Sequence, residues 1–425
     1  MNYEEAREYL AGIAAKGNLL GLEPIRCLLQ EMGNPQNDLN FVHIAGTNGK
    51  GSVLAYTASI LEQAGLRVGR YISPTLFSYE EKIQINEEYI TKEAVARLVT
   101  EIRRARERAA AQGKPETTIF EVETVLSFLY FREQICDLVL LETGMGGRED
   151  ATNVVERVLV EIIASISMDH MEFLGNTLEE IAWNKAGIIK KNTQVLSDLQ
   201  QPEAEAVLRR VCRQQQATLY LVDKDQLGSV RYGLEEQSFD YRGLKNLVIH
   251  LAGTCQIGNA ALALETIFAL QREGFSISEE AIRTGLAKTR WPGRFQLLHK
   301  NPQVIVDGAH NPQAAQVLMD AIEKYFPDKK IYYIFGVFSD KEYDKIIRIT
   351  AKRAEKIFTV ETKENPRALP ARLLTEAVQK VNPAVLTVGD VPKAIDLALQ
   401  EAGKEDVILI FGSLSFQWEV KNYPF

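Results

Sequence analysis

The sequence lacks the features of a membrane-spanning or secreted chain. It contains no apolar run that approaches the ~20 residues a helix needs to cross a bilayer. Its polar, acidic start has no charged segment followed by an apolar one, so we expect no secretory signal. The four cysteines show no CxxC spacing, which argues against a zinc knuckle or a disulfide scaffold. We therefore expect a chain that works in a reducing cytoplasm.

Positive charge is in deficit. Lys and Arg number 49 against 57 Asp and Glu, which gives a formal net charge of -8. This balance argues against a general binder of nucleic acid or of anionic membranes. Any anionic ligand must therefore be met by a few local groups. We expect small-molecule partners, no nucleic acid, no membrane and a monomeric chain.

What the sequence does contain is the composition of a globular α/β protein. Its 425 residues, 46% hydrophobic and 25% charged, exceed the ~250–300 at which a single core stops growing, so we expect two domains. Candidate strands alternate with candidate helices, which is typical of a mostly parallel sheet with helices on both faces. The strands span residues 40–45, 67–72, 138–142, 162–167 and 193–196, and the helices include 52–63, 91–112 and 121–133.

The alternation restarts in a tighter rhythm after about residue 296. Candidate strands lie at 304–307, 331–335, 356–360, 385–388 and 407–411, with helical patterns beginning near Pro312, Lys341, Pro370 and Pro392. We predict an N-terminal domain over residues 1–296 and a smaller, Rossmann-like C-terminal α/β domain over residues 297–425. Their junction should lie near residues 290–295.

A glycine-rich segment between the first candidate strand and its helix is a candidate phosphate loop. It runs Gly46-Thr47-Asn48-Gly49-Lys50-Gly51-Ser52. Glycines let backbone N–H groups turn toward an anion, the helix start adds a favourable field, and Lys50 can neutralise outer phosphates. Ser52 is placed to reach a metal. The spacing departs from GxxxxGK[ST], and a plain Gly-Asn turn is the alternative, although such a turn needs no lysine.

Polar residues also follow the ends of three other candidate strands. Ser73, Glu142 and His170 are expected to converge on one crevice, because ligands of open α/β sheets bind at the carboxyl ends of strands. Oxygen donors and one imidazole suit Mg²⁺ bound together with nucleotide phosphates. Taken singly, each has the alternative role of a cap or surface partner. Lys185 would by default be a solvent-facing lysine on a helix.

Three further candidates lie in the second half of the chain. Arg294 is placed to bind phosphate, with an interdomain salt bridge as its alternative. Asp307 and His310 follow a candidate strand and precede a helix, so they should face the same space. The remaining histidines, His43, His250 and His299, are assigned structural roles.

Taken in order, these motifs resemble the folylpolyglutamate synthase and dihydrofolate synthase family of the Mur ligase superfamily. The resemblance spans nearly the whole chain. Besides the residues above it includes Gly21-Leu22, Phe120-Glu121, Gly147-Arg148, Asp150-Ala151-Thr152-Asn153, Lys185-Ala186-Gly187-Ile188, Gln256, Asn259 and Gly412-Ser413. It implies a P-loop ATP-binding domain followed by a C-terminal ligase domain.

The resemblance also implies an activity and its cofactors. The activity is ATP-dependent addition of L-glutamate to folates, to dihydropteroate, or to both, through an acyl phosphate. The cofactors are ATP and two Mg²⁺ ions, with a monovalent cation as a further candidate. The residues implied to bind nucleotide are Thr47, Asn48, Gly49, Lys50, Gly51, Ser52, Asn259, Arg294, Asp307 and His310.

The same resemblance assigns the metal, acceptor and catalytic residues. Metal would be held by Ser52, Ser73, Glu142, His170 and by Lys185, the last as a carbamate formed with CO₂. The folate or dihydropteroate would contact Gly21, Leu22, Phe120, Glu121, Glu149, Asp150 and Ala151. The catalytic set would be Lys50, His170, Lys185 and His310. Thr75 and Cys255 stand where the family usually has histidine, which leaves details of the substrate loop open.

Two alternatives remain. Another ligase of the superfamily, acting on a non-folate carboxylate such as a muramyl peptide, would generally carry an extra domain before the phosphate loop, yet the loop here begins at Gly46. A nucleotide-dependent regulatory ATPase or switch is the other. A GTPase would want an NKxD motif, and residues 184–187 end in glycine instead.

Overall fold

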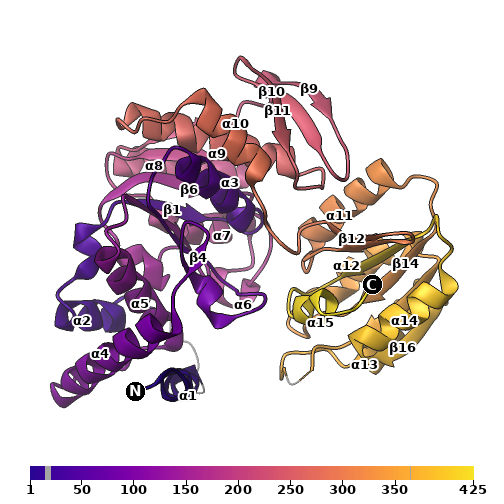
Figure 1. Ribbon diagram of the computed structural model, residues 1–425, viewed down its shortest axis with the longest axis horizontal. Helices are drawn as coiled ribbons and strands as arrows, with labels where there is room; N and C mark the ends of the chain where they lie inside the picture. The colour runs from indigo at the N-terminus through magenta and orange to yellow at the C-terminus, as the bar shows by residue number, and fades with distance from the viewer. Residues whose placement is uncertain (15–20, 364) are drawn as a thin grey trace. The chain divides into compact units, whose positions relative to one another are not determined.

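A computed structural model describes residues 1–14, 21–363 and 365–425 of the chain (Figure 1). Its contacts divide the chain into two compact units. Unit 1 comprises Met1–Lys224 and Gly258–Lys288, and unit 2 comprises Asp225–Ile257 and Thr289–Phe425. The expected boundary between residues 296 and 297 stays a prediction. Across the described ranges, no helix has the length and apolar character needed to span a membrane.

Unit 1 is built on an eight-stranded sheet in the order β4-β3-β2-β5-β1-β6-β7-β8. The strands from β2 to β8 in this order pair in parallel, and β3 and β4 add an antiparallel edge, so the predicted mostly parallel sheet is confirmed. The strands are β1 (Phe41–Ala45), β2 (Val68–Tyr71), β3 (Ile83–Ile85), β4 (Glu88–Tyr89), β5 (Leu138–Glu142), β6 (Val158–Ile163), β7 (Gln194–Ser197) and β8 (Thr218–Leu221).

Strand β6 lies four residues earlier than the predicted strand at 162–167. The sequence pattern missed its first half because Glu161 interrupts an otherwise apolar run. That side chain is nevertheless fully buried, and one carboxylate oxygen accepts a hydrogen bond from the Lys190 N–H at 2.9 Å. A hydrogen-bond donor thus lets a polar residue stand inside a buried strand.

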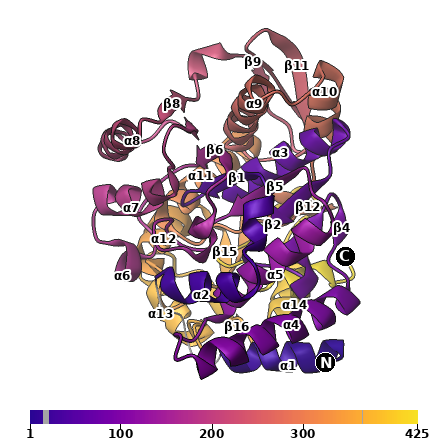
Figure 2. The ribbon, with the colours of Figure 1, turned by 90° about the vertical axis from the view of Figure 1, so that its left-hand side faces the viewer.

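Helices cover both faces of this sheet (Figures 1 and 2). One face carries α3 (Lys50–Gln63), α9 (Gln256–Arg272) and α10 (Glu279–Lys288). Helix α3 is buried on nearly all sides because α10 covers it, and a Cβ at Gly285 would lie 2.4 Å from the Ile60 Cα. The opposite face carries α1 (Tyr3–Ala14), α2 (Glu23–Glu31), α4 (Lys92–Ala111) and α5 (Ile119–Glu133), with α6 (Met171–Leu174), α7 (Leu178–Lys185) and α8 (Pro202–Gln215) toward β7.

Unit 2 contains a six-stranded sheet in the order β12-β13-β17-β14-β15-β16, in which only β12 runs antiparallel to its neighbour. Apolar cores form on both of its faces. The strands are β12 (Gln296–Lys300), β13 (Gln303–Val306), β14 (Ile331–Phe335), β15 (Lys356–Val360), β16 (Val385–Gly389) and β17 (Val407–Phe411). The helices are α11 (Pro312–Tyr325), α12 (Tyr343–Thr350), α13 (Ala371–Gln379), α14 (Val391–Glu401) and α15 (Gln417–Lys421).

Unit 2 also holds a small antiparallel sheet that the sequence pattern did not reveal. It consists of β9 (Leu227–Arg231), β10 (Gln237–Tyr241) and β11 (Leu244–Ile249). Gln237 ties it to the chain that follows, since its amide nitrogen donates to the Leu251 carbonyl at 2.6 Å. Its short strands carry mixed polar and apolar residues, which gives a weak periodic signal.

Candidate active site

The glycine-rich segment lies between β1 and α3 as expected. Gly49 caps α3 with φ of 88°, and a Cβ there would lie 2.8 Å from the Asn259 Oδ1, so only glycine fits without strain. Asn259, an expected nucleotide contact, thus lies directly against the loop. Among the described residues no side chain caps the start of α3, so its first N–H groups keep the positive field that attracts anions.

The loop is held rigidly by the chain that follows β6. The Thr47 N–H donates to the Ser165 carbonyl at 2.7 Å, and the Asn48 N–H donates to the same oxygen at 3.2 Å. The Thr47 hydroxyl donates to the Ser167 carbonyl at 3.1 Å and accepts from the Ser167 N–H at 3.0 Å. This lock was not foreseen from the sequence, because it joins segments 120 residues apart.

Two lysines meet at the loop backbone. The Lys50 Nζ donates to the Gly46 carbonyl at 3.2 Å and lies 3.9 Å from a carboxylate oxygen of Glu142. The Lys185 Nζ, from the end of α7, donates to the same Gly46 carbonyl at 2.9 Å. Lys185 is only 3% exposed, so the solvent-facing alternative is wrong. Burial, followed by the charge of Lys50, lowers the pKa of Lys185 to about 7.

Oxygen donors gather at the end of β5. Glu142 is the last residue of that strand, is buried, and accepts from the Ser73 N–H at 3.4 Å. Ser52 is buried in the first turn of α3. His170 precedes α6 with φ of 51°, is exposed, and its N–H donates to the Asp169 carboxylate at 2.9 Å. The structure therefore brings Ser73, Glu142 and Lys50 together.

The donor set suits a hard cation better than a soft one. Within the described residues no three His, Cys, Asp or Glu side chains cluster as a ready-made metal site. A cation beside Glu142 would therefore take its other ligands from hydroxyls, water and phosphate oxygens. Mg²⁺ is bound in this way in nucleotide sites, by one or two carboxylates together with substrate phosphates. The residues present fit Mg²⁺ on these grounds.

The segments expected to bind the acceptor have clear structural duties as well. The Glu121 carboxylate closes a capping box at the start of α5, accepting from the Thr118 N–H at 2.6 Å, and burial raises its pKa. The Phe120 ring lies over Gly144, where a Cβ would come within 2.6 Å of it. Asp150 is buried, while Glu149 is exposed.

The other acceptor residues begin and end short elements. Gly21 has φ of 133°, and Leu22 precedes α2. Ala151 opens a 3₁₀ turn, η3 (Ala151–Val154), which Asp150 caps. Residues 15–20 lie outside the described part of the chain, so nothing is added about that approach to α2.

In unit 2, Asp307 organises the residues around it. Its partly buried carboxylate accepts from the Phe295 N–H and from the Ala309 N–H, each at 2.8 Å. Burial raises its pKa, and the nearby charge of Arg294 opposes that shift. The Arg294 guanidinium lies against Gly308, where a Cβ would collide with it. The His310 Nδ1 bonds the Gly308 carbonyl at 2.8 Å, so the three expected residues form one group.

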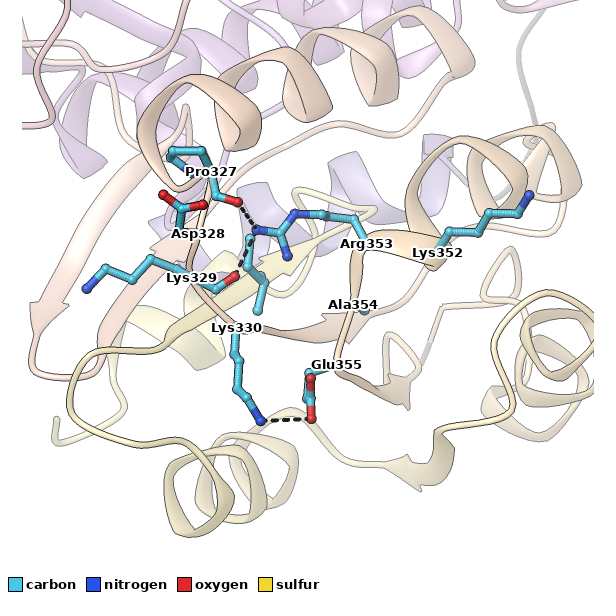
Figure 3. Close-up of a pocket in the computed structure, with 9 residues that line it drawn as sticks. Pro327, Asp328, Lys329, Lys330, Lys352, Arg353, Ala354 and Glu355 are labelled. Atoms are coloured by element: carbon cyan, nitrogen blue, oxygen red, sulfur yellow. Dashed lines mark hydrogen bonds and ion pairs between the residues drawn. The ribbon is translucent and has the colours of Figure 1, made fainter.

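A basic hollow elsewhere in unit 2 is lined by cations of which Arg353 and Lys330 are engaged by neighbouring groups (Figure 3). It lies at the amino ends of β14 and β15, opposite the strand ends that carry Asp307. The Arg353 guanidinium donates to the Phe326 and Lys329 carbonyls, each at 2.8 Å. Lys330 pairs with Glu355 at 3.1 Å. These contacts give the cations a structural role, and the hollow is not assigned to a ligand.

Comparison with known proteins identifies the family. A profile described as "Mur ligase middle domain" matches residues 44–267, and one described as "Mur ligase, glutamate ligase domain" matches residues 293–414. The dihydrofolate synthase/folylpolyglutamate synthase of Bacillus subtilis is 34% identical over 99% of this chain and 98% of its own length. The chain belongs to the folylpolyglutamate synthase and dihydrofolate synthase family of Mur ligases.

Solved structures of the family share the whole architecture. Mycobacterium tuberculosis folylpolyglutamate synthase complexed with ADP is 28% identical, with a TM-score of 0.90 over 99% of this chain and 98% of that one. E. coli FolC in complex with DHPP and ADP is 30% identical, with a TM-score of 0.87 over 99% of this chain and 97% of that one. The two-part α/β fold expected from the resemblance is therefore confirmed.

Proposed function

We propose that this chain is an ATP-dependent ligase that adds L-glutamate to folates, to dihydropteroate, or to both, through an acyl phosphate. The observation that carries the proposal is the phosphate loop, with two lysines on the Gly46 carbonyl and the Glu142 carboxylate beside them. A regulatory nucleotide binder needs no buried lysine at that place. Full coverage of the bifunctional B. subtilis relative adds support.

The nucleotide would lie on the start of α3. Loop N–H groups and Lys50 would hold the phosphates of ATP, and Asn259, which already touches Gly49, would face the base. Ser52, Ser73 and Glu142 would hold one Mg²⁺, and Glu142, His170 and Lys185 a second. When bound, the metal ions would offset the negative charge of the phosphoryl group that is transferred.

Both the lowered pKa of Lys185 and its position at the phosphate loop suit formation of a carbamate on its amine. Only a neutral amine adds to CO₂, forming an N–C bond and releasing one proton. With a pKa of about 7, Lys185 is neutral in a large share of molecules at neutral pH, whereas an exposed lysine is almost wholly charged. The product is an anion beside Lys50, so the repulsion between the two ammonium groups becomes attraction.

The chemistry then follows in two steps. An acceptor carboxylate oxygen attacks the γ-phosphorus and ADP leaves, with Lys50 stabilising the charge that builds on the phosphoryl oxygens. The glutamate amine attacks the acyl carbon, loses a proton, and inorganic phosphate leaves. Arg294 would bind phosphate, Asp307 the ribose hydroxyls, and His310, with Nδ1 held by Gly308, would lie near the γ-phosphate.

The test is product formation with two acceptors. Purified protein with ATP, Mg²⁺ and L-glutamate is given dihydropteroate or tetrahydrofolate, and products are weighed by mass spectrometry. Addition of one glutamyl unit supports the ligase and assigns its acceptor, and addition to both makes it bifunctional. No addition to either, with ATP hydrolysis that ignores glutamate, would overturn the proposal in favour of a regulatory ATPase. A muramyl nucleotide serves as the control acceptor.

A further inference from the structure

A buried chain of hydrogen bonds runs from the middle of β1 to Asp150. The His43 Nε2 lies 2.8 Å from the Thr152 hydroxyl oxygen, and that hydroxyl lies 2.5 Å from the Asp150 Oδ1. His43 and Thr152 are both fully buried, and Asp150 is 5% exposed. The chain joins the strand that carries the phosphate loop to the segment expected to bind the acceptor.

The direction of each bond follows from counting protons. Asp150 also accepts from the Thr152 N–H at 3.0 Å and from the Met145 N–H at 2.8 Å, so it acts as a carboxylate acceptor. The single hydroxyl proton of Thr152 must then point to Asp150. Its oxygen is left to accept from His43, which fixes the proton of that ring on Nε2.

The ring is held neutral by its surroundings. Burial, followed by the charge of Lys190, lowers the pKa of His43 well below its ordinary value. The other ring nitrogen, Nδ1, has no hydrogen-bond partner within the described residues. Glu161 is the β6 residue paired with His43 in the parallel register, and Lys190 bonds to it through its N–H. A proton on Nδ1 would thus be a buried donor without an acceptor.

Asp150 in turn shapes the segment that leads from Glu142. Its bond to Met145 closes the turn between them. Asn153, on the same 3₁₀ turn, donates to the Arg148 and Gly187 carbonyls, each at 3.0 Å. Fixing the Asp150 carboxylate therefore fixes the glycine-rich segment between the proposed metal and acceptor sites.

We propose that His43 is a positioning residue for the acceptor, holding the Asp150 carboxylate in place through the Thr152 hydroxyl. The inference rests on the proposed function, since it takes Asp150 as an acceptor contact. His43 touches no substrate. Without its Nε2–H, the Thr152 oxygen has no donor and its hydroxyl is held less firmly, so the charge-assisted bond from Thr152 to the buried Asp150 carboxylate weakens.

The test removes and restores each half of the chain. His43→Leu deletes the ring donor, and Thr152→Val deletes the hydroxyl at nearly constant volume. His43→Gln restores an N–H at the reach of Nε2, and Thr152→Ser restores the hydroxyl. Thr266→Val is the matched control, because Thr266 is equally buried but its hydroxyl bonds only the Leu262 carbonyl of its own helix at 3.0 Å.

Two quantities are measured for each variant. The first is KM for the acceptor and for ATP, with kcat at saturation. The second is hydrogen exchange of the Met145 amide, which reports the Asp150 bond without requiring catalysis.

We expect His43→Leu and Thr152→Val each to raise the acceptor KM about 10-fold or more, the size of a lost bond to a charged group, and to change the ATP KM and kcat less than about threefold. Met145 exchange should quicken in both. The double variant should be no worse than Thr152→Val alone, because both act through one chain. The Gln, Ser and Thr266→Val variants should stay near wild type.

Unchanged acceptor KM and Met145 exchange in Thr152→Val would overturn the inference while leaving an active ligase. Equal losses in acceptor KM, ATP KM and kcat would also overturn it, because they mark general destabilisation. A His43→Leu protein that does not fold shifts the decision to Thr152→Val and its Ser rescue. A wild type that ligates neither acceptor would remove the proposed function and the inference with it.

Discussion

The two units of the molecule contain the same strand–loop–helix crossing, but a described side chain caps the start of the helix in only one of them. In unit 1, β1 passes through Gly46–Ser52 into α3, and no described side chain caps the helix. In unit 2, β13 passes through Asp307 into α11, where the Asn311 side chain caps the helix by accepting from the Ala314 N–H at 2.9 Å. The start of α3 thus carries no cap from a described side chain, although the loop N–H groups of Thr47 and Asn48 already bond Ser165, whereas the start of α11 is capped by its own Asn311.

The difference shows that topology alone does not make a phosphate site. Asp307 brings a carboxylate to the place where unit 1 has glycine, and that carboxylate occupies two backbone N–H groups. This crossing can therefore offer a ligand side chains rather than backbone N–H groups, and Arg294 and His310 are the candidates. A loop that binds phosphate through its backbone needs glycine and no self-capping.

The central strands of the two sheets also differ in how many polar side chains they bury. In unit 2, β14 and β17 carry only aliphatic and aromatic side chains, all buried. In unit 1, the neighbouring β1 and β6 carry His43 and Glu161 at paired positions in the sheet interior. The central strands of unit 1 therefore accept buried polar groups near the site, while β14 and β17 of unit 2 do not.

The largest effect should come from the buried lysine of unit 1. Lys185→Met removes the amine that would carry the carbamate, and we expect ligation to fall by about 10³-fold or more with little loss of thermal stability. Lys190→Met is the matched control. That lysine is also largely buried, with its pKa lowered to about 8, but it bonds Asn153 and not the loop.

Rate assays with and without added bicarbonate check the same point. Wild type depleted of CO₂ should slow and recover on addition, and the Lys190→Met protein should behave likewise with less than about a 10-fold loss. Lys185→Met retaining more than a tenth of wild-type activity would contradict the carbamate role.

The next largest effect concerns Asp307 of unit 2 and the stability of the fold. Asp307→Ala leaves the Phe295 and Ala309 N–H groups without their acceptor, so we expect the free energy of unfolding to drop by about 2–4 kcal/mol. Asp307→Asn keeps one acceptor oxygen and should lose about half as much. Urea denaturation measures both, with the exposed Asp328→Ala as the control. A loss no larger than that of the control would show that these two hydrogen bonds do not stabilise the fold.

Sequence reasoning captured the regular parts of the fold for a physical reason. The strands at 331–335, 356–360 and 407–411 coincide with β14, β15 and β17, because continuous apolar runs bounded by turns have one consistent solution. It failed at β6, where Glu161 breaks the pattern, and at β9 to β11, whose alternation is weak.

The candidate site divides in a similar way. The loop motif pointed to Lys50, and the family order pointed to Lys185, but nothing local indicated that Lys185 would be buried on a carbonyl 139 residues away. The hydrogen bond between His43 and Thr152 joins residues 109 positions apart, and no local sequence pattern indicates it either. The capping box at Thr118 and Glu121 did have a local signal, since a threonine followed three residues later by glutamate before an apolar run is typical of a helix start.

The smallest effect concerns the buried charge in β6 and depends on pH. Burial raises the pKa of Glu161 from 4.5 to about 7, so the folded state holds its proton more tightly than the unfolded state. The favourable contribution is therefore fully present below about pH 4.5 and is lost as the pH rises through about 7.

Glu161→Gln stays neutral and keeps an acceptor for the Lys190 N–H, while Lys190 loses the opposite charge. In urea unfolding, the difference in free energy of unfolding between Glu161→Gln and wild type should favour the variant by about 1 kcal/mol more at pH 8 than at pH 5. This is less than the full pKa shift would give, because Lys190 has no opposite charge beside it in the variant. The exposed Glu156→Gln should show no such trend, and a Glu161→Gln difference that is flat with pH would mean that Lys190 fully compensates the carboxylate.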